Sequence, residues 1–321
     1  MSEMILQTIG LTKSFAARRA SFFGQKVKHV AVDRVSLSVR EGETLGLVGE
    51  SGCGKSTLAL TVMRLYEPTS GQILFAGRDI TGFSEGALKP VRRQMQMVFQ
   101  DPFASLDPRL TVEQIISEPL DIHAIGSREE RREAVTQLLD RVGLSDMDMY
   151  RYPSEFSGGQ QQRIAVARSL ALRPRLLICD EPVSALDVSV QAQILNLLRD
   201  LQDEFTLAYL FISHNIAVTA FMSRRIGVMY LGRVVEVGPS HKIVNEPRHP
   251  YTQALLAAVP EPVPSRRETE GGVEGDVPES AGRPSGCAFR TRCPLAQVRC
   301  TTEEPQLRLV GEAHVVACHF A

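Results

Sequence analysis

Glycine, lysine and hydroxyl side chains between Gly49 and Thr57 are spaced in a pattern that suits a phosphate group, GESGCGKST. The segment matches G-x-x-x-x-G-K-[ST], follows the apolar run TLGLVGE and precedes a helical pattern. Glycines let backbone N–H groups converge on phosphate oxygens, and the helix adds its positive end. The pattern predicts that Lys55 reaches the β- and γ-phosphates, Ser56 a magnesium ion and Thr57 a neighbouring phosphate oxygen. We interpret Cys53 as a packing residue.

Two adjacent carboxylates, Asp180 and Glu181, end the apolar run RLLICDEP. A buried strand can deliver such a pair to the C-terminal edge of a sheet, beside a phosphate loop. Because neighbouring residues on a strand point in different directions, the two carboxylates can divide the chemistry. We assign Asp180 to magnesium, largely through water, and Glu181 to the attacking water as general base. The alternative is an ordinary acidic turn before Pro182.

A second candidate anion site begins at Phe156, in FSGGQQQR. Ser157 and two glycines open a helical stretch, QQQRIAVARSLAL, whose N-terminus can bind an anion. One chain therefore carries two phosphate-binding surfaces that are far apart in sequence.

Strand patterns alternate with amphipathic helices through about residue 255, which predicts an α/β core with a largely parallel sheet. One helix begins at Ser127, where Glu130 completes a capping box, and another begins at Asp187 as N-cap. Their predicted core faces recur at helical spacing. These faces are Ala134, Val135, Leu138, Leu139 and Val142 in the first helix, and Val190, Ile194, Leu197, Leu198 and Leu201 in the second.

Composition excludes several classes of protein. The 321 residues carry a formal net charge of −1, with 43% hydrophobic and 23% charged residues, so nothing indicates a nucleic-acid partner. No apolar run reaches the length needed to span a bilayer, and the N-terminus does not resemble a signal peptide. We therefore expect a cytosolic location, where thiols stay reduced.

The combination of GESGCGKST, FSGGQ, LLICDEP, SALD and the isolated Ser213–His214 pair resembles the ATP-binding subunit of ABC transporters. The resemblance covers residues 1–255. It implies a P-loop NTPase cassette of α/β class, with a mixed sheet core and a helical signature subdomain at about 101–170. It also implies that ATP lies between two head-to-tail subunits. Phe156 stands where the family most often has leucine.

The resemblance also implies roles for individual residues. Gln100 matches the glutamine that senses magnesium and the membrane partner, and His214 matches a γ-phosphate contact that acts with Glu181. Phe15 is the best match for the adenine-stacking aromatic, with Phe22, Phe23 and His29 as rivals. The implied ATP contacts are Phe15, Gly49, Glu50, Ser51, Gly52, Cys53, Gly54, Lys55, Ser56, Thr57 and Gln100, and the implied magnesium residues are Ser56, Gln100 and Asp180. The residues implied to face a partner subunit are Ser157, Gly158, Gly159 and Gln160 of the signature, and Ser184, Ala185, Leu186 and Asp187 of the D-loop.

Three further segments, VFQDPFASLDPRLTVEQIISEPL, VMYLGRVVEVG and EPRHPYTQALLAAVP, look like the peptide/nickel importer subfamily. This resemblance implies an F-type ATPase that pairs with a second ATPase, two permease subunits and, indirectly, a solute-binding protein at the cytoplasmic face of a bacterial inner membrane. An oligopeptide or dipeptide is the favoured solute; nickel, glutathione or another small solute is the alternative. A non-transport ATPase is disfavoured, since residues 58–156 leave no room for a long coiled coil.

The amino-acid composition changes toward the C-terminus. Residues 256–286 are rich in Pro, Gly, Glu and Ser and are predicted to form a linker or loop. Residues 287–321 form a small extension with four cysteines in a C-x5-C-x6-C-x17-C pattern: Cys287, Cys293, Cys300 and Cys318. Disulfides, zinc, a [4Fe–4S] cluster and free thiols all remain open from the spacing alone. The resemblance to dipeptide-type ATPases implies the cluster, with zinc as the alternative.

Overall fold

The computed structural model describes residues 3–16, 28–258 and 283–321, which divide into two compact units. Unit 1 comprises Met1–Ile5, Val39–Glu43 and Gly82–Phe211, and unit 2 comprises Leu6–Ser38, Thr44–Thr81 and Ile212–Ala321. Most of the predicted linker (259–282) lies outside the described residues, and so do Phe22 and Phe23.

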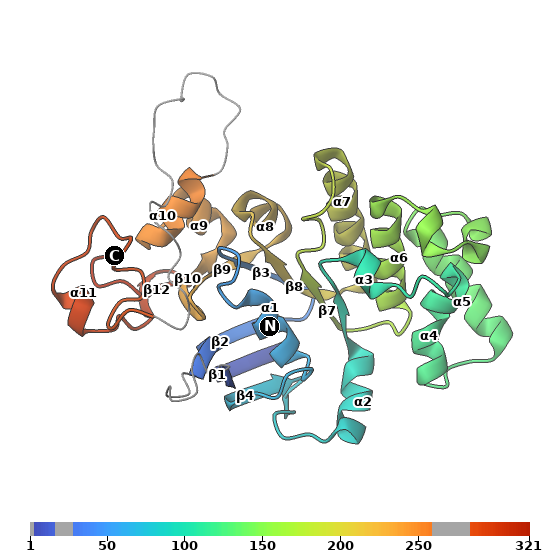
Figure 1. The fold of residues 1–321 in the computed structure, drawn as a ribbon, viewed down its shortest axis with the longest axis horizontal. Coiled ribbons are helices and arrows are strands. Elements are labelled where there is room, and N and C mark those ends of the chain that lie inside the picture. The colour runs from blue at the N-terminus through green and yellow to red at the C-terminus, as the bar shows by residue number, and fades with distance from the viewer. Residues whose placement is uncertain (1–2, 17–27, 259–282) are drawn as a thin grey trace, which may run out of the picture. The chain divides into compact units, whose positions relative to one another are not determined.

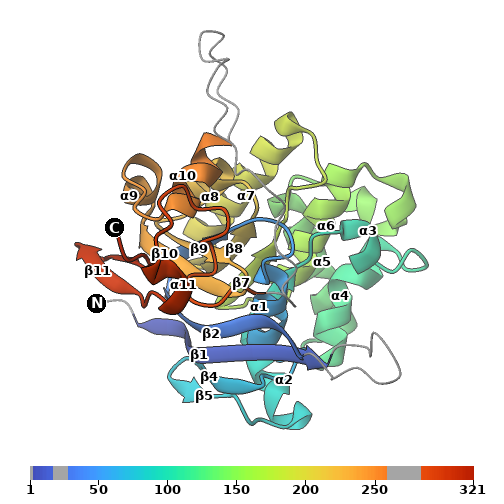
Figure 2. The ribbon, with the colours of Figure 1, turned by 60° about the vertical axis from the view of Figure 1, so that its left-hand side comes forward.

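A four-stranded sheet belongs to unit 2 except for Met4, Ile5, Val39 and Arg40 at two strand ends, and Figure 2 shows its strands side by side. In spatial order the strands are β2 (Lys28–Arg40), β1 (Met4–Ala16), β4 (Ser70–Phe75) and β5 (Arg78–Asp79). β4 pairs antiparallel with both β1 and β5. Val35, Leu37 and Val39 are buried at alternate positions of β2, so one face of this sheet packs inward.

A second group of strands in unit 2 positions the phosphate loop. In spatial order they are β11 (Arg308–Gly311), β12 (His314–Val316), β10 (Arg233–Pro239), β9 (Arg225–Tyr230) and β3 (Thr44–Val48). β3 runs parallel to β9, whereas the pairs from β9 to β11 are antiparallel, so the arrangement is mixed. Figure 1 shows β12 beside β10. Residues 283–321, which we call the tail, therefore extend the strands of unit 2.

The helices of unit 2 are short: α1 (Lys55–Val62), α8 (Ile216–Met222), α9 (Ser240–Asn245), α10 (Pro250–Ala257) and α11 (Arg299–Thr302). α8 packs directly on β3 at Gly46, where an added Cβ would lie 2.3 Å from Cγ2 of Thr219. Every residue of β3 is buried, which fixes the strand that leads into the phosphate loop.

Unit 1 combines parallel strands with most of the helices. β6 (Met95–Val98) and β7 (Leu176–Asp180) are parallel, and β8 (Ala208–Ser213), whose last two residues belong to unit 2, neighbours β7. The helices are α2 (Glu85–Gln94), α3 (Pro102–Ser105), α4 (Val112–Ile122), α5 (Arg128–Arg141), α6 (Gly158–Leu170) and α7 (Val188–Phe205), with short 3-10 turns at Asp146–Tyr150 and Pro153–Glu155. Figure 1 shows α4, α5 and α6 packed together.

The predicted helix signals are largely confirmed. Ser127 and Glu130 form the capping box of α5, and the predicted apolar faces of α5 and α7 are mostly buried. Asp187 occupies the N-cap position of α7, but its side chain accepts no capping hydrogen bond. Within the described residues, no helix has both the length and the apolar character to cross a membrane.

Candidate active site

The phosphate loop depends on two glycines that no other residue could replace. A Cβ on Gly49 would lie 2.2 Å from the carbonyl oxygen of Met229 in β9. Gly54 has a φ of 104°, and a Cβ there would lie 2.1 Å from the carbonyl oxygen of Ala31 in β2. The loop is therefore pressed against two neighbouring strands, which gives it a fixed path.

Lys55 begins α1 and is buried, at 4% exposure. Its ammonium donates to the carbonyl oxygens of Gly49, 2.7 Å away, and Glu50, 3.0 Å away. The ammonium is thus held under the loop by these two carbonyl groups. A bound phosphate would replace them as its hydrogen-bond partner. Ser56 and Thr57 follow in the first turn of α1, half-buried. Burial raises the pKa of the Cys53 thiol, which suits a packing residue.

An aromatic pair marks the candidate adenine position. The Phe15 ring, near the end of β1, meets Tyr66 edge-on at 5.4 Å between centroids. The Lys13 ammonium lies 4.9 Å from the Phe15 centroid. Among the rivals, His29 is half-buried in β2. The sequence reading missed Tyr66, because it follows α1 in a segment without a recognisable motif.

His214 lies on the exposed bend between β8 and α8. The bend is fixed on both sides: Asn215 N–H donates to the Ser213 hydroxyl at 3.0 Å, and the Asn215 side chain caps the first turn of α8. These bonds set the direction in which the imidazole leaves the backbone. Since α8 packs on β3, His214 is tied to the strand that carries the phosphate loop.

The two carboxylates end the buried strand β7 in unit 1, with Asp180 6% and Glu181 9% exposed. Glu181 has a φ of 48°, a left-handed conformation that costs a non-glycine residue about 1–2 kcal/mol. The Gln100 amide donates to a Glu181 carboxylate oxygen at 3.2 Å. The Ser184 N–H and hydroxyl both donate to the Glu181 carbonyl oxygen, at 3.2 and 3.1 Å. The backbone turn and the amide together fix this carboxylate.

The signature segment forms the N-terminus of α6. Ser157 is its N-cap, and with Gln160 it makes a reciprocal capping box. An added Cβ on Gly159 would lie 2.4 Å from Cγ1 of Val190, so α6 and α7 meet through this glycine. Phe156 is buried, and the Arg151 guanidinium lies 4.3 Å from its ring centroid. Phe156, which stands where the family most often has leucine, is therefore accommodated as a buried side chain.

The predicted D-loop, Ser184 to Asp187, connects β7 to α7. Ala185 and Asp187 are exposed, while Leu186 N–H donates to the carbonyl oxygen of Val183 at 3.2 Å.

The predicted site residues fall into two sets, one in each unit. Unit 2 holds the phosphate loop, Phe15 and His214; unit 1 holds the rest, listed as Gln100, Ser157–Gln160, Asp180, Glu181 and Ser184–Asp187.

The four tail cysteines do not form the metal centre that we expected. All six cysteines of the chain are free thiols. Within 3–16, 28–258 and 283–321, no group of three or more His, Cys, Asp or Glu residues is placed to hold a metal ion. The physical reason lies in the packing, since Cys287 and Cys293 lie against an apolar cluster and Cys300 is buried. The thiols still influence one another. Burial raises the pKa of Cys287, and the charges of the other three tail cysteines raise it further.

Two family models match this chain. The model described as ABC transporter matches residues 32–184, and the model described as oligopeptide/dipeptide transporter, C-terminal region, matches residues 235–300. The second match includes α10 and the first three cysteines of the tail.

Curated relatives are similar along their whole length. The oligopeptide transport ATP-binding protein AppF of Bacillus subtilis (strain 168) is 52% identical over 99% of this chain and 98% of its own. The di/tripeptide transport ATP-binding protein DppF of Pseudomonas aeruginosa (strain UCBPP-PA14) is 48% identical over 99% and 98%.

Solved structures share the fold. The ATP-binding cassette MJ0796, determined as a dimer in a post-hydrolysis state with ADP and Pi, is 30% identical, with a TM-score of 0.66, over 73% of this chain and 98% of that one. The cbiO1 protein of Clostridium perfringens, part of the ABC transporter complex cbiONQ, is 27% identical, with a TM-score of 0.66, over 76% and 92%.

Proposed function

The chain belongs to the ATP-binding subunits of oligopeptide/dipeptide ABC transporters, and from that membership we propose that it powers the import of short peptides. It is an ABC-type ATPase with the cassette fold of that family. The observation that carries the peptide assignment is the full-length similarity to AppF and DppF, which extends through the tail. Nickel, glutathione and other small solutes are the competing cargoes.

The residues of the site suggest how they divide the reaction. The phosphate-loop amides and Lys55 bind the β- and γ-phosphates, and Glu181 accepts a proton from the attacking water. His214 contacts the γ-phosphate, and the Phe15–Tyr66 pair supports the adenine. Ser56, Gln100 and Asp180 stay the proposed magnesium residues, because a hydroxyl, an amide and a carboxylate supply the oxygen ligands that the ion prefers; a bound ion would neutralise phosphate charge.

The partners follow from surfaces that one chain cannot use alone. Ser157 is exposed at the α6 N-terminus, which suits the ATP of a partner cassette, as do the exposed D-loop residues. We assign that partner to a second, different ATPase. Phe99 and Phe103, 36% and 65% exposed, flank Gln100 in sequence and suit a permease contact. The chain would then sit on the cytoplasmic face of the bacterial inner membrane through two permeases, with a solute-binding protein outside.

The domain division and the occupant of the tail belong to the same proposal. We keep residues 1–255 as the cassette and 287–321 as a thiol-bearing extension. Besides burial, the charges of the other thiols raise the pKa of Cys287, which indicates that the four side chains lie near one another; a shared [4Fe–4S] cluster, with zinc as the alternative, is the occupant that we propose for them. Counting iron, sulfide and zinc per chain after anaerobic purification decides this point. Zinc at one per chain without sulfide rejects the iron–sulfur cluster, and absence of all three rejects a metal.

Transport in cells tests the main proposal. A strain that lacks this gene and requires an amino acid is supplied with that amino acid only inside a di- or tripeptide. Restoring the gene should restore growth, while the Lys55→Ala variant should not. Parallel uptake assays with nickel and with glutathione identify the cargo. Growth that is equal with and without the gene, together with gene-dependent uptake of nickel or glutathione, would overturn the peptide assignment.

A further inference from the structure

The tail reaches back to the phosphate loop through one ion pair. Arg292 lies between Cys287 and Cys293, and its two terminal nitrogens bond the two carboxylate oxygens of Glu50 at 2.8 and 2.9 Å. The side chains are 5% and 22% exposed. Bidentate, largely buried arginine–carboxylate pairs are the strong and geometrically specific kind. The hydrogen bonds from this pair raise the pKa of Arg292 above its ordinary range.

Glu50 is the second residue of the phosphate loop, and every polar part of it is engaged. Its N–H donates to the Tyr251 hydroxyl at 2.8 Å. Its carbonyl oxygen accepts from the Lys55 ammonium at 3.0 Å and from Cys53 N–H at 3.3 Å. Arg292 is thus connected to Lys55 through a single residue, Glu50.

The tail segment that carries Arg292 is itself firmly placed. Phe289 is 2% exposed and packs against Tyr230 and Tyr251, with centroids 5.3 and 5.4 Å apart. Tyr251 is the same residue whose hydroxyl accepts the Glu50 N–H. The aromatic cluster therefore couples the position of the tail to the backbone of the loop.

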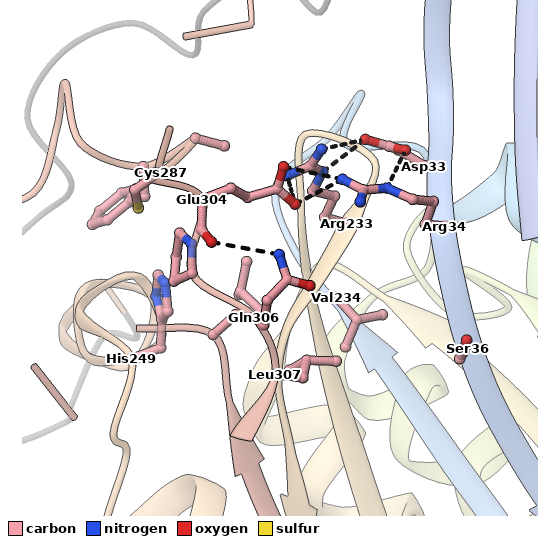
Figure 3. A pocket seen from close by; sticks show the side chains of 15 residues that line it. Asp33, Arg34, Ser36, Arg233, Val234, His249, Cys287, Glu304, Gln306 and Leu307 are labelled. Atoms are coloured by element: carbon pink, nitrogen blue, oxygen red, sulfur yellow. Dashed lines mark hydrogen bonds and ion pairs between the residues drawn. The ribbon is translucent and has the colours of Figure 1, made fainter. Parts of the chain in front are cut away.

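Two further tail residues, Glu304 and His314, anchor the tail to the rest of unit 2. Glu304 pairs with Arg34 at 2.7 Å and with Arg233, and Figure 3 shows its carboxylate pointing at both guanidinium groups. His314 contacts the fully buried carboxylate of Glu236 at 2.8 Å. Arg292 therefore projects from an element fixed at several points, as a positioning group requires.

Charge gives the pair a second effect. A phosphate loop must receive a highly charged anion, yet this loop carries a carboxylate at Glu50. An unpaired carboxylate there would repel the phosphates at short range and low dielectric. A guanidinium bonded to both of its oxygens neutralises it and also holds the side chain away from the phosphate position.

We propose that Arg292 is a positioning residue for the nucleotide: through Glu50 it fixes the phosphate loop and cancels the loop's own negative charge. The tail is then a working part of the ATP site rather than an appendage. The inference rests on the proposed function only in that the loop binds Mg·ATP. It assigns no contact between Arg292 and the nucleotide itself.

Equilibrium binding of Mg·ATP to the purified full-length chain tests the role of Arg292. For Arg292→Gln we expect Kd to rise about tenfold, since a charge in the loop is left unpaired. The matched control is Arg299→Gln, which breaks the exposed Arg299–Glu303 pair of the same tail and should leave Kd unchanged. Arg292→Lys keeps the charge but loses the bidentate geometry, so its Kd should lie between those of the wild type and Arg292→Gln.

A double-mutant cycle tests whether Arg292 acts through Glu50. Adding Glu50→Gln to Arg292→Gln removes the unpaired carboxylate and should recover most of the affinity, so the effects of the two substitutions should be non-additive. In the assembled transporter, Arg292→Gln should raise KM for ATP while kcat changes less than about twofold, since Glu181 is untouched. Equal Kd in Arg292→Gln and Arg299→Gln, or purely additive effects in the cycle, would overturn the proposal.

A measurement on the wild-type chain covers the case in which Arg292→Gln does not fold. Coupling is reciprocal, so Mg·ATP should slow alkylation of the half-buried Cys287 and Cys293, as followed by mass spectrometry. Alkylation rates that Mg·ATP does not change would contradict the coupling. The outcomes remain distinct from those of the proposed function, because a chain that binds and hydrolyses ATP but shows no such coupling loses only this inference.

Discussion

The Gln100 side-chain amide donates a hydrogen bond to a carboxylate oxygen of Glu181 at 3.2 Å, across 81 positions of sequence. The bond joins the segment after β6 to the end of β7, two parallel strands that pair along their length. Glu181 also has a left-handed backbone conformation, and its carbonyl oxygen accepts a hydrogen bond from the Ser184 hydroxyl. The candidate general base is therefore oriented before any substrate arrives, and the amide that orients it is the one expected to respond to magnesium.

Replacing Glu181 by Gln should separate ATP binding from hydrolysis. The amide keeps the size of the side chain but cannot accept the proton of the attacking water, so we expect steady-state ATPase activity to fall by at least about a hundredfold. Affinity for Mg·ATP should stay within a few-fold of the wild type, and with the partner ATPase a closed cassette dimer should accumulate. Phosphate release and size-exclusion chromatography measure the two effects. Near-normal turnover would remove Glu181 from the role of base.

Lys55→Ala should weaken nucleotide binding itself. The ammonium now donates to the carbonyl oxygens of Gly49 and Glu50 under the loop, and no other described side chain replaces it there. We expect ATP affinity to fall at least about tenfold, with loss of peptide import. Lys89→Ala, at an exposed position of α2, is the matched control and should leave both unchanged. Import by cells that carry only the Lys55→Ala protein would count against the motor role.

Gly159→Ala should destabilise the contact of α6 with α7. The new Cβ would meet Cγ1 of Val190 at 2.4 Å, an overlap that we expect to cost about 1–3 kcal/mol. Gly86→Ala, in α2 with open space around the position, is the control and should be neutral or slightly stabilising. Adding Val190→Ala should recover part of the loss. Urea unfolding measures all four chains, and equal midpoints for Gly159→Ala and Gly86→Ala would show that the overlap is relieved elsewhere.

His249 should make stability fall at acidic pH. It is 1% exposed, its Nδ1 accepts the Tyr251 N–H as the cap of α10, and burial lowers its pKa from 6.5 to about 4. Between these values the unfolded chain binds the proton and the folded chain does not, so stability is full above pH 6.5 and lost as pH falls toward 4. The shift corresponds to about 3 kcal/mol.

His249→Asn isolates this contribution. Asparagine can still cap α10 but does not titrate. Urea unfolding at pH 7 and pH 4.5 should show a smaller loss of stability in the variant than in the wild type, although the variant is less stable at pH 7. Equal losses in the two chains would place the acid sensitivity elsewhere.

Local patterns in the sequence predicted a good part of this molecule. The phosphate loop could be read from Gly49 to Thr57 because its motif is made by neighbouring residues, and the same holds for the capping box at Ser127 and the helix start at Ser157. The apolar run before Asp180 predicted a buried strand, and β7 is buried throughout. Each of these features is encoded within a few residues of itself.

Other features depend on contacts that no local pattern announces. Arg292 and Glu50 are 242 positions apart, and an arginine in a polar tail gives no sign of its partner. Tyr66 meets Phe15 only because the end of β1 comes close to the turn after α1. The cysteine spacing left several states of the thiols open, and the shared metal was implied only by the resemblance; neither announced that Cys287 and Cys293 pack against an apolar cluster.

The order of synthesis gives the tail a further consequence. Unit 2 is built from three separate stretches of chain, and the last includes Arg292, Glu304 and His314. Glu50 therefore gains its contact with Arg292 only after that part of the tail has left the ribosome. A chain that stops before Gly286 would lack Phe289 and would leave the buried rings of Tyr230 and Tyr251 without that cover.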